Sequence, residues 1–130
     1  MKKIGLIVNP IAGMGGSVGL KGTDNAAAEA FRRGAIPRAG DRAKAALSEL
    51  LSMKEELFVY TCQGSMGGDI AGELGFRTVM KPEALDGLNS VDKRASMDGG
   101  MLPGPLFRTG AADTKSLAEW LLKEEVDLIL

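Results

Sequence analysis

The sequence predicts an α/β fold with a mostly parallel, Rossmann-like sheet, and three observations support this prediction. Short apolar runs of strand length alternate with segments of helical periodicity. The first run, KIGLIV at 3–8, is almost continuously apolar, which is typical of a parallel strand covered on both faces. Glycine-rich turns at 13–16 and 64–68 each follow such a run. Strands alternating with helices favour βαβ units with helices on both faces of the sheet.

The strands are expected at four places. They are predicted at 3–8, 57–61, 76–80 and 127–130. The third, FRTVM, is more polar and therefore predicts a more exposed strand, whereas VDLIL near residue 130 has the composition of an interior strand. The carboxyl edge of such a sheet, where both glycine turns lie, is the usual place for a ligand.

The helices follow from caps and periodicity. AAAEAFRR lies between a possible N-cap at Asp24 and a C-terminal glycine, Gly34. DIAGEL is closed by Gly75, and another helix is expected from Asp113. A helix near 41–53, after Pro37 and Gly40, carries an apolar stripe of Ala43, Ala46, Leu47, Leu50 and Leu51. On the helix from Asp113, one face carries Leu117, Trp120 and Leu121.

Residues 81–112 do not fit this alternation. The segment has no sustained periodicity and contains Pro-Gly-Pro at 103–105. About thirty residues without regular structure are unusual inside a compact domain. Two interpretations stay open: an irregular surface insertion, or a lid or interface arm that orders when a ligand or partner binds.

Composition excludes several classes of site. A chain of 130 residues with a net charge of −1 and no basic block predicts one domain that does not bind nucleic acid. The sequence has no histidine and a single cysteine, Cys62, so a Ser-His-Asp triad, a Cys-His pair and a structural zinc site are excluded within it. The lone cysteine favours a reducing, cytoplasmic location. No apolar run approaches the roughly 20 residues of a membrane span.

The segment NPIAGMGGSVGLKGTD at 9–24 is the main functional candidate. It fails the Walker A pattern, because Leu20 precedes Lys21, and it fails GxGxxG at Val18. Glycines still permit backbone N–H groups to converge on an anion, beside Lys21 and a helix start. The alternative is a tight strand-to-helix connection, and spacing alone leaves both open. QGSMGGD, at 63–69, is better interpreted as a plain turn with Asp69 at a helix start.

KKIGLIVNPIAGMGGSVGLKGTD resembles, almost position for position, the N-terminus of the ATP-NAD kinase-like family, which includes proteins linked with acetoin catabolism operons. TCQGSMGGDIAGELGF is similar to the family's segment after its second strand. AADTKSLAEWLLKEEVDLIL is similar to the helix and strand that lead to its GGDGT motif. The resemblance covers most of 1–80 and 109–130.

This resemblance implies a phosphofructokinase-like α/β domain followed by an all-β domain, with the active site between them. It implies transfer of phosphate from ATP, or another donor, to the 2′-hydroxyl of NAD, with Mg²⁺ or another divalent cation, in a homo-oligomer. Lipid kinases have a shorter turn at the same place, which favours the phosphate cradle. The implied ligand-loop residues are Asn9, Gly13, Gly15, Gly16, Lys21, Gly22, Thr23 and Asp24.

The sequence departs from the family at three points. GGDGT is absent, Asn25 stands where glycine is expected, and 81–108 resembles an insertion. Residues 1–130 are therefore interpreted as the N-terminal nucleotide-binding domain of a two-domain kinase without its all-β domain. That interpretation assigns no catalytic residue to this chain and expects it to be inactive alone. The alternatives are a non-catalytic nucleotide-binding module or sensor and a lipid-kinase relative.

Overall fold

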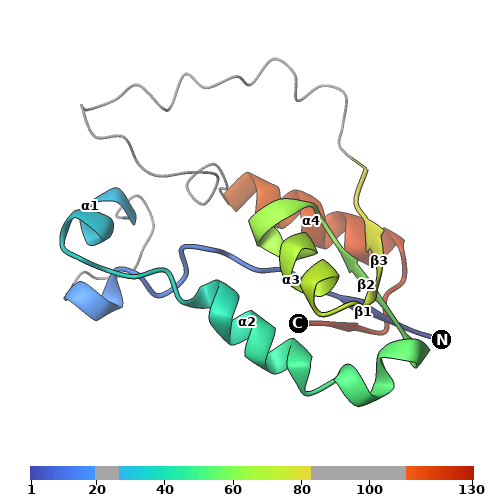
Figure 1. Cartoon of the computed structure of the whole chain (residues 1–130). Helices are drawn as coiled ribbons and strands as arrows, with labels where there is room; N and C mark the ends of the chain where they lie inside the picture. The colour runs from blue at the N-terminus through green and yellow to red at the C-terminus, as the bar shows by residue number, and fades with distance from the viewer. Residues whose placement is uncertain (20–26, 83–110) are drawn as a thin grey trace.

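The computed structural model describes residues 1–19, 27–82 and 111–130 (Figure 1). Its four strands form one sheet in the order β3-β2-β1-β4, and every neighbouring pair is parallel. The strands are β1 (Lys2–Gly5), β2 (Leu57–Thr61), β3 (Arg77–Met80) and β4 (Leu128–Ile129). The predicted α/β class with a parallel sheet is confirmed.

The strand order places β1 between β2 and β4. Lys2 is opposite Leu57 on one side, and Ile4 is opposite Leu128 on the other. The chain builds outward from β1 through β2 to β3, and β4 then lies on the opposite side of β1. Such a reversal is a topological switch point, and open α/β sheets bind ligands outside the carboxyl ends of the strands there.

Helices cover both faces of the sheet, as the apolar runs predict. On one face, Ile4, Leu6 and Val59 pack in a core with Leu47 of α2 (Ala39–Ser48) and Ile70 of α3 (Gly68–Glu73). On the other face, residues that alternate with these pack under α4 (Ala111–Lys123). That second core contains Ile7, Tyr60, Cys62, Met66, Leu117, Trp120, Leu121 and Val126.

Two helices end at the glycines that the sequence predicted as their C-terminal residues. Gly34, after α1 (Ala27–Arg32), has φ 87°, and Gly75, after α3, has φ 74°. In this left-handed region glycine carries no Cβ penalty. The predicted start of α4 at Asp113 was two residues late, because its helical hydrogen bonding already includes Ala111.

The second helix was predicted at the wrong bounds. It begins at Ala39, includes Gly40 in its first turn, and ends at Ser48 instead of running over 41–53. The chain then tightens into a 3-10 helix, Leu51–Glu56, which changes the direction of the following side chains. Leu47 is buried as expected, but Ala46 and Leu51 are exposed, so the apolar stripe is narrower than predicted.

Two strands differ from expectation. The first was predicted to reach Val8, but its ladder with β2 ends at Gly5. The chain nevertheless stays bonded to β2 for one residue more, because the N–H of Leu6 donates to Tyr60 O at 2.8 Å. The last strand was interpreted as interior, yet Leu128 is 54% exposed and Ile129 is 39% exposed. Composition shows that this strand is apolar, but its position beside β1 alone, in the described sheet, leaves it at an edge.

Most of the irregular segment predicted at 81–112 lies outside the described residues, which resume at Ala111. Lys81 and Pro82 follow β3 without regular structure, and Ala111 and Ala112 belong to α4, so the predicted segment extended two residues too far. None of the helices in the described part combines the length and apolar character that crossing a bilayer requires.

Candidate functional site

The chain leaves the sheet at Val8 and enters a loop that is held by its own hydrogen bonds. The N–H of Val8 donates to Met66 O at 2.9 Å, which ties the start of the loop to the turn after β2. Asn9 then organises the first bend: its side-chain Oδ1 accepts from the N–H of Ile11 at 3.2 Å, and its backbone O accepts from Ala12 at 3.0 Å. Asn9 therefore has a structural role as an Asx turn, besides lining the hollow described below.

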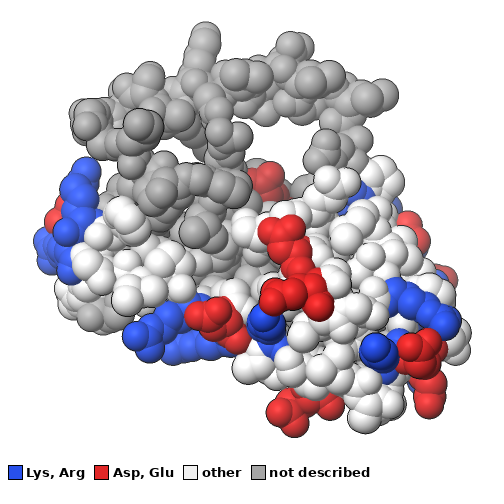
Figure 2. Space-filling view, in the orientation of Figure 1, with Lys and Arg blue, Asp and Glu red and all other residues white. Residues whose placement is uncertain are grey.

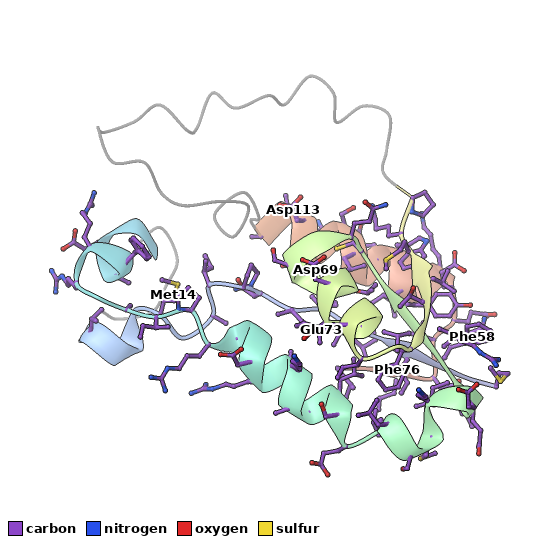
Figure 3. All side chains as sticks on the ribbon, in the orientation of Figure 1. Met14, Phe58, Asp69, Glu73, Phe76 and Asp113 are labelled. Atoms are coloured by element: carbon purple, nitrogen blue, oxygen red, sulfur yellow. The ribbon has the colours of Figure 1, made fainter. Side chains whose placement is uncertain are left out.

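A small apolar cluster anchors the far side of the loop. Met14 is 1% exposed and packs with Ala30 of α1 and with Ala35. Ile11 and Val18 contact the same cluster. Figure 3 shows Met14 beside α1, away from the main sheet. The loop is therefore fixed at both ends, by a hydrogen bond to Met66 and by the burial of Met14.

The glycines of this loop differ from one another in backbone conformation. Gly13 and Gly19 have φ of 77° and 78°, a region that disfavours side chains. Gly15 is right-handed helical with φ −62°, and Gly16 begins a short 3-10 helix. A Cβ built at Gly13, Gly16 or Gly19 meets no atom of the described residues within 4 Å. Close packing therefore does not explain these three glycines.

A hollow opens between this loop and α2. Its volume is about 270 Å³. A smaller hollow of about 50 Å³ adjoins it and shares Ala12, Gly13 and Arg42. The larger hollow is lined by Ile7, Val8, Asn9, Ala12, Gly13, Ala39, Arg42 and Ala43, and the smaller one by Ala12, Gly13, Ile36, Arg38 and Arg42. The hollow lies at the carboxyl end of β1, the strand at the switch point.

Positive charge enters the hollow from α2. Arg38 immediately precedes the helix and Arg42 lies in its first turn, and both are exposed. Within the described ranges neither arginine forms an ion pair, whereas Arg32 and Arg33 both pair with Glu29. Figure 2 shows basic side chains over the start of α2, with an acidic side chain beside them. No side chain caps the helix, so its first N–H groups also favour an anion.

The structure brings together only part of the predicted ligand loop. Asn9 and Gly13 line the hollow, whereas Gly15 is buried and Gly16 is exposed outside the lining. Lys21, Gly22, Thr23 and Asp24 lie outside the described residues. The N–H groups of Ile11, Ala12 and Met14 are donated inside the loop, so these three do not converge on a ligand.

Arg38 and Arg42 were missed by the sequence reasoning. The available signal was PRAGDR at 37–42, which places two arginines four residues apart at a helix start. Their proximity to Gly13 depends on how α2 packs beside the first loop, and no local pattern reveals that.

The second glycine turn is a closed structure, as its interpretation as a plain turn predicts. Gly64 and Gly67 have φ of 75° and 144°, and Asp69 lies in the first turn of α3. A Cβ at Gly67 would lie 2.3 Å from Thr61 Oγ1, and one at Gly68 would lie 2.7 Å from Cys62 O. Gly67 and Gly68 therefore serve close packing, whereas a Cβ at Gly64 would meet no atom of the described residues within 4 Å.

Cys62 is half-buried beneath α4, and burial raises the pKa of its thiol, although the nearby Lys81 charge partly opposes this. A raised pKa does not favour a nucleophilic thiolate at neutral pH. In the part of the chain that the structure describes, no three acidic, cysteine or histidine side chains gather closely enough to hold a metal ion.

Comparisons with known proteins assign no family to this chain. No family model matches it, and neither the curated proteins nor the solved structures contain a match. The resemblance of its N-terminal segment to ATP-NAD kinase-like proteins stays a prediction that rests on the residues quoted for it.

Proposed function

We propose that the protein binds nucleotides as an ATP-NAD kinase-like phosphotransferase of phosphofructokinase-like fold, which transfers phosphate from ATP or another donor to the 2′-hydroxyl of NAD. One observation supports this most strongly: the hollow of about 270 Å³ at the carboxyl end of β1, lined by Asn9, Gly13 and Arg42. Ligands of open parallel sheets bind at this edge, where the strand order reverses.

The lining suits part of a nucleotide. Ile7, Val8 and Ala43 provide apolar surface for a ring, and Arg42 provides a charge for phosphate. The volume is near the lower end of ligand pockets, about 300 Å³. We therefore assign this hollow to one portion of the nucleotide.

Phosphoryl transfer requires alignment of donor and acceptor and neutralisation of the charge on the phosphate oxygens. The arginines of α2 would supply positive charge, and by the resemblance Lys21 would add to it. Mg²⁺ would supply further neutralisation of phosphate charge when bound with the nucleotide, and the described residues offer no carboxylate set that would hold it by themselves. The GGDGT motif is not among these 130 residues, and the proposal assigns no catalytic residue within them.

A second candidate is a non-catalytic nucleotide-binding module. It is favoured by the lining of both hollows, in which the described residues include no aspartate or glutamate to act as a base or metal ligand. Homo-oligomerisation is part of the kinase proposal only.

Calorimetric titration with ATP–Mg²⁺ and, separately, with NAD tests the proposal. Ala12 is exposed and lines both hollows, so Ala12→Leu should fill the site and weaken binding at least tenfold. Ala45→Leu, on the exposed face of α2, is the matched control and should bind like the original protein. Absence of saturable binding by a folded protein would contradict the proposal. Formation of NADP would separate the kinase from the binding module.

A further inference from the structure

We propose that Arg38 and Arg42 form a two-point site for a diphosphate group in the smaller hollow. The inference rests on the nucleotide-binding function proposed above and names the part of the ligand that Arg38 and Arg42 recognise. The inference does not depend on Lys21 or on the other residues of the predicted ligand loop.

The geometry supports this assignment. Arg38 and Arg42 both line the hollow of about 50 Å³, and Gly13 lies in the same lining. Residues four apart lie on one side of a helix, so the two arginines reach the same place. A guanidinium binds a phosphate through two parallel N–H groups, and two guanidinium groups provide such contacts for two phosphates. Gly13 has no Cβ, and no atom of the residues that the structure describes lies within 4 Å of the Cβ position, which leaves room for oxygens.

The two arginines at the hollow differ from the other arginines that the structure describes. Each of those meets a carboxylate: Arg32 and Arg33 pair with Glu29, and Arg77 pairs with Glu55 at 3.0 Å. Lys44, on the same helix as Arg42, pairs with Glu73. Within residues 1–19, 27–82 and 111–130, Arg38 and Arg42 have no such partner. Two neighbouring like charges repel, so an anion between them relieves an unfavourable interaction.

Asp41 is the nearest carboxylate in sequence, but it does not line either hollow. It lies between the two arginines on the helix and forms no ion pair with them in the described part of the chain. Asp41 is adjacent to Arg42 and points in a different direction, but it follows Arg38 by three residues, a spacing at which side chains on a helix can meet. Because no ion pair joins Asp41 to either arginine among the described residues, both guanidinium groups are available to an anion.

Titration calorimetry with inorganic pyrophosphate and with inorganic phosphate tests the site without a nucleoside. We expect pyrophosphate to bind at least about tenfold more tightly than phosphate, a difference of about 1.4 kcal/mol, since it makes a second charged contact. Arg38→Ala and Arg42→Ala should each weaken pyrophosphate binding about tenfold or more, and Arg42→Lys should retain part of it. Arg32→Ala is the matched control, since Arg32 is exposed but paired with Glu29, and should change binding less than twofold.

Each outcome supports or overturns the site. Equal losses in Arg42→Ala and Arg32→Ala would indicate general charge attraction and overturn it, as would absence of pyrophosphate binding by the folded protein. Binding of ATP–Mg²⁺ that is unchanged in both arginine variants would overturn this site and leave the kinase proposal standing. Pyrophosphate binding that both arginine variants lose, in a protein that binds neither ATP nor NAD, would support the site and overturn the kinase proposal.

Discussion

The two glycine-rich turns of this protein look alike in sequence and differ in structure. In the turn after β2, the spaces beside Gly67 and Gly68 are already filled, by Thr61 Oγ1 and by Cys62 O. In the loop after β1, no atom of the described part of the chain lies within 4 Å of a Cβ at Gly13, Gly16 or Gly19. Gly67 and Gly68 therefore permit close packing in one turn, although Gly64 of the same turn has open space beside it, whereas the glycines of the other turn leave a backbone uncovered beside a hollow.

The difference teaches that glycine content alone does not indicate a ligand site. What separates the two turns is the environment of the missing side chain. The packed turn supports the loop that precedes the hollow, because Met66 O accepts the N–H of Val8 at 2.9 Å. One turn is thus a structural support for the other.

The largest expected effect is at Gly67. Gly67→Ala places a methyl 2.3 Å from Thr61 Oγ1 at φ 144°, so we expect unfolding free energy to fall by about 3 kcal/mol. Urea denaturation followed by circular dichroism measures this. Gly16→Ala is the control: its space is open and its φ is not positive, so its change should stay within about 0.5 kcal/mol. Equal losses in both variants would contradict the comparison.

A smaller effect is expected at Thr61, whose buried hydroxyl donates to Leu6 O at 2.9 Å. Thr61→Val leaves that carbonyl without its side-chain donor, so the free energy of unfolding should fall by about 1–2 kcal/mol. The same urea experiment applies. Thr78→Val on β3 serves as a control, since no side-chain hydrogen bond of Thr78 occurs among the described residues. If Thr78→Val lowers the free energy of unfolding and Thr61→Val does not, the hydrogen bond from Thr61 to Leu6 O does not stabilise the protein.

Substitution of Gly13 should lower the free energy of unfolding only through the backbone conformation that the residue must adopt. Gly13→Ala must adopt φ 77° without a steric clash, so we expect a loss of about 1 kcal/mol. Gly13→Asn should recover part of this, because asparagine tolerates the left-handed region. If Gly13→Ala proves as costly as Gly67→Ala in urea unfolding, the loop after β1 is packed more closely than its empty surroundings indicate.

The smallest effect concerns Cys62, which belongs to the closed turn. Burial raises the pKa of its thiol, so alkylation by iodoacetamide near pH 8 should be slower in the folded protein than in urea. The folded state retains the proton more tightly, so this contribution to stability is present below the unfolded pKa and is lost as pH rises through the folded pKa. Equal alkylation rates with and without urea at pH 8 would contradict a protected thiol.

The sequence predicted the bounds of several helices and strands better than it predicted how exposed they are. It placed β2 at its observed bounds, because LFVYT is an apolar run of strand length, and it identified Gly34 and Gly75 as helix ends from local glycine signals. It misjudged the exposure of the strand near residue 128, because apolar composition does not reveal which position a strand takes in the sheet.

The candidate site was predictable only in part. Asn9 and Gly13 belong to one contiguous segment, whose turn chemistry is visible in the letters. Arg38 and Arg42 reach the same hollow from a helix more than twenty residues later. That proximity follows from how α2 packs on the sheet through Leu47, a tertiary effect that periodicity does not describe.

The central place of β1 has a consequence for how the protein is made. The backbone N–H of Lys3 bonds to the side chain of Asp127, 124 residues later. At about 5–20 residues per second, a ribosome needs roughly 6–25 s to synthesise the intervening chain. During that time β1 can pair with β2 but not with β4, so one edge of the nascent sheet stays open. Chaperones that shield apolar strand edges would find this opening on every newly made molecule.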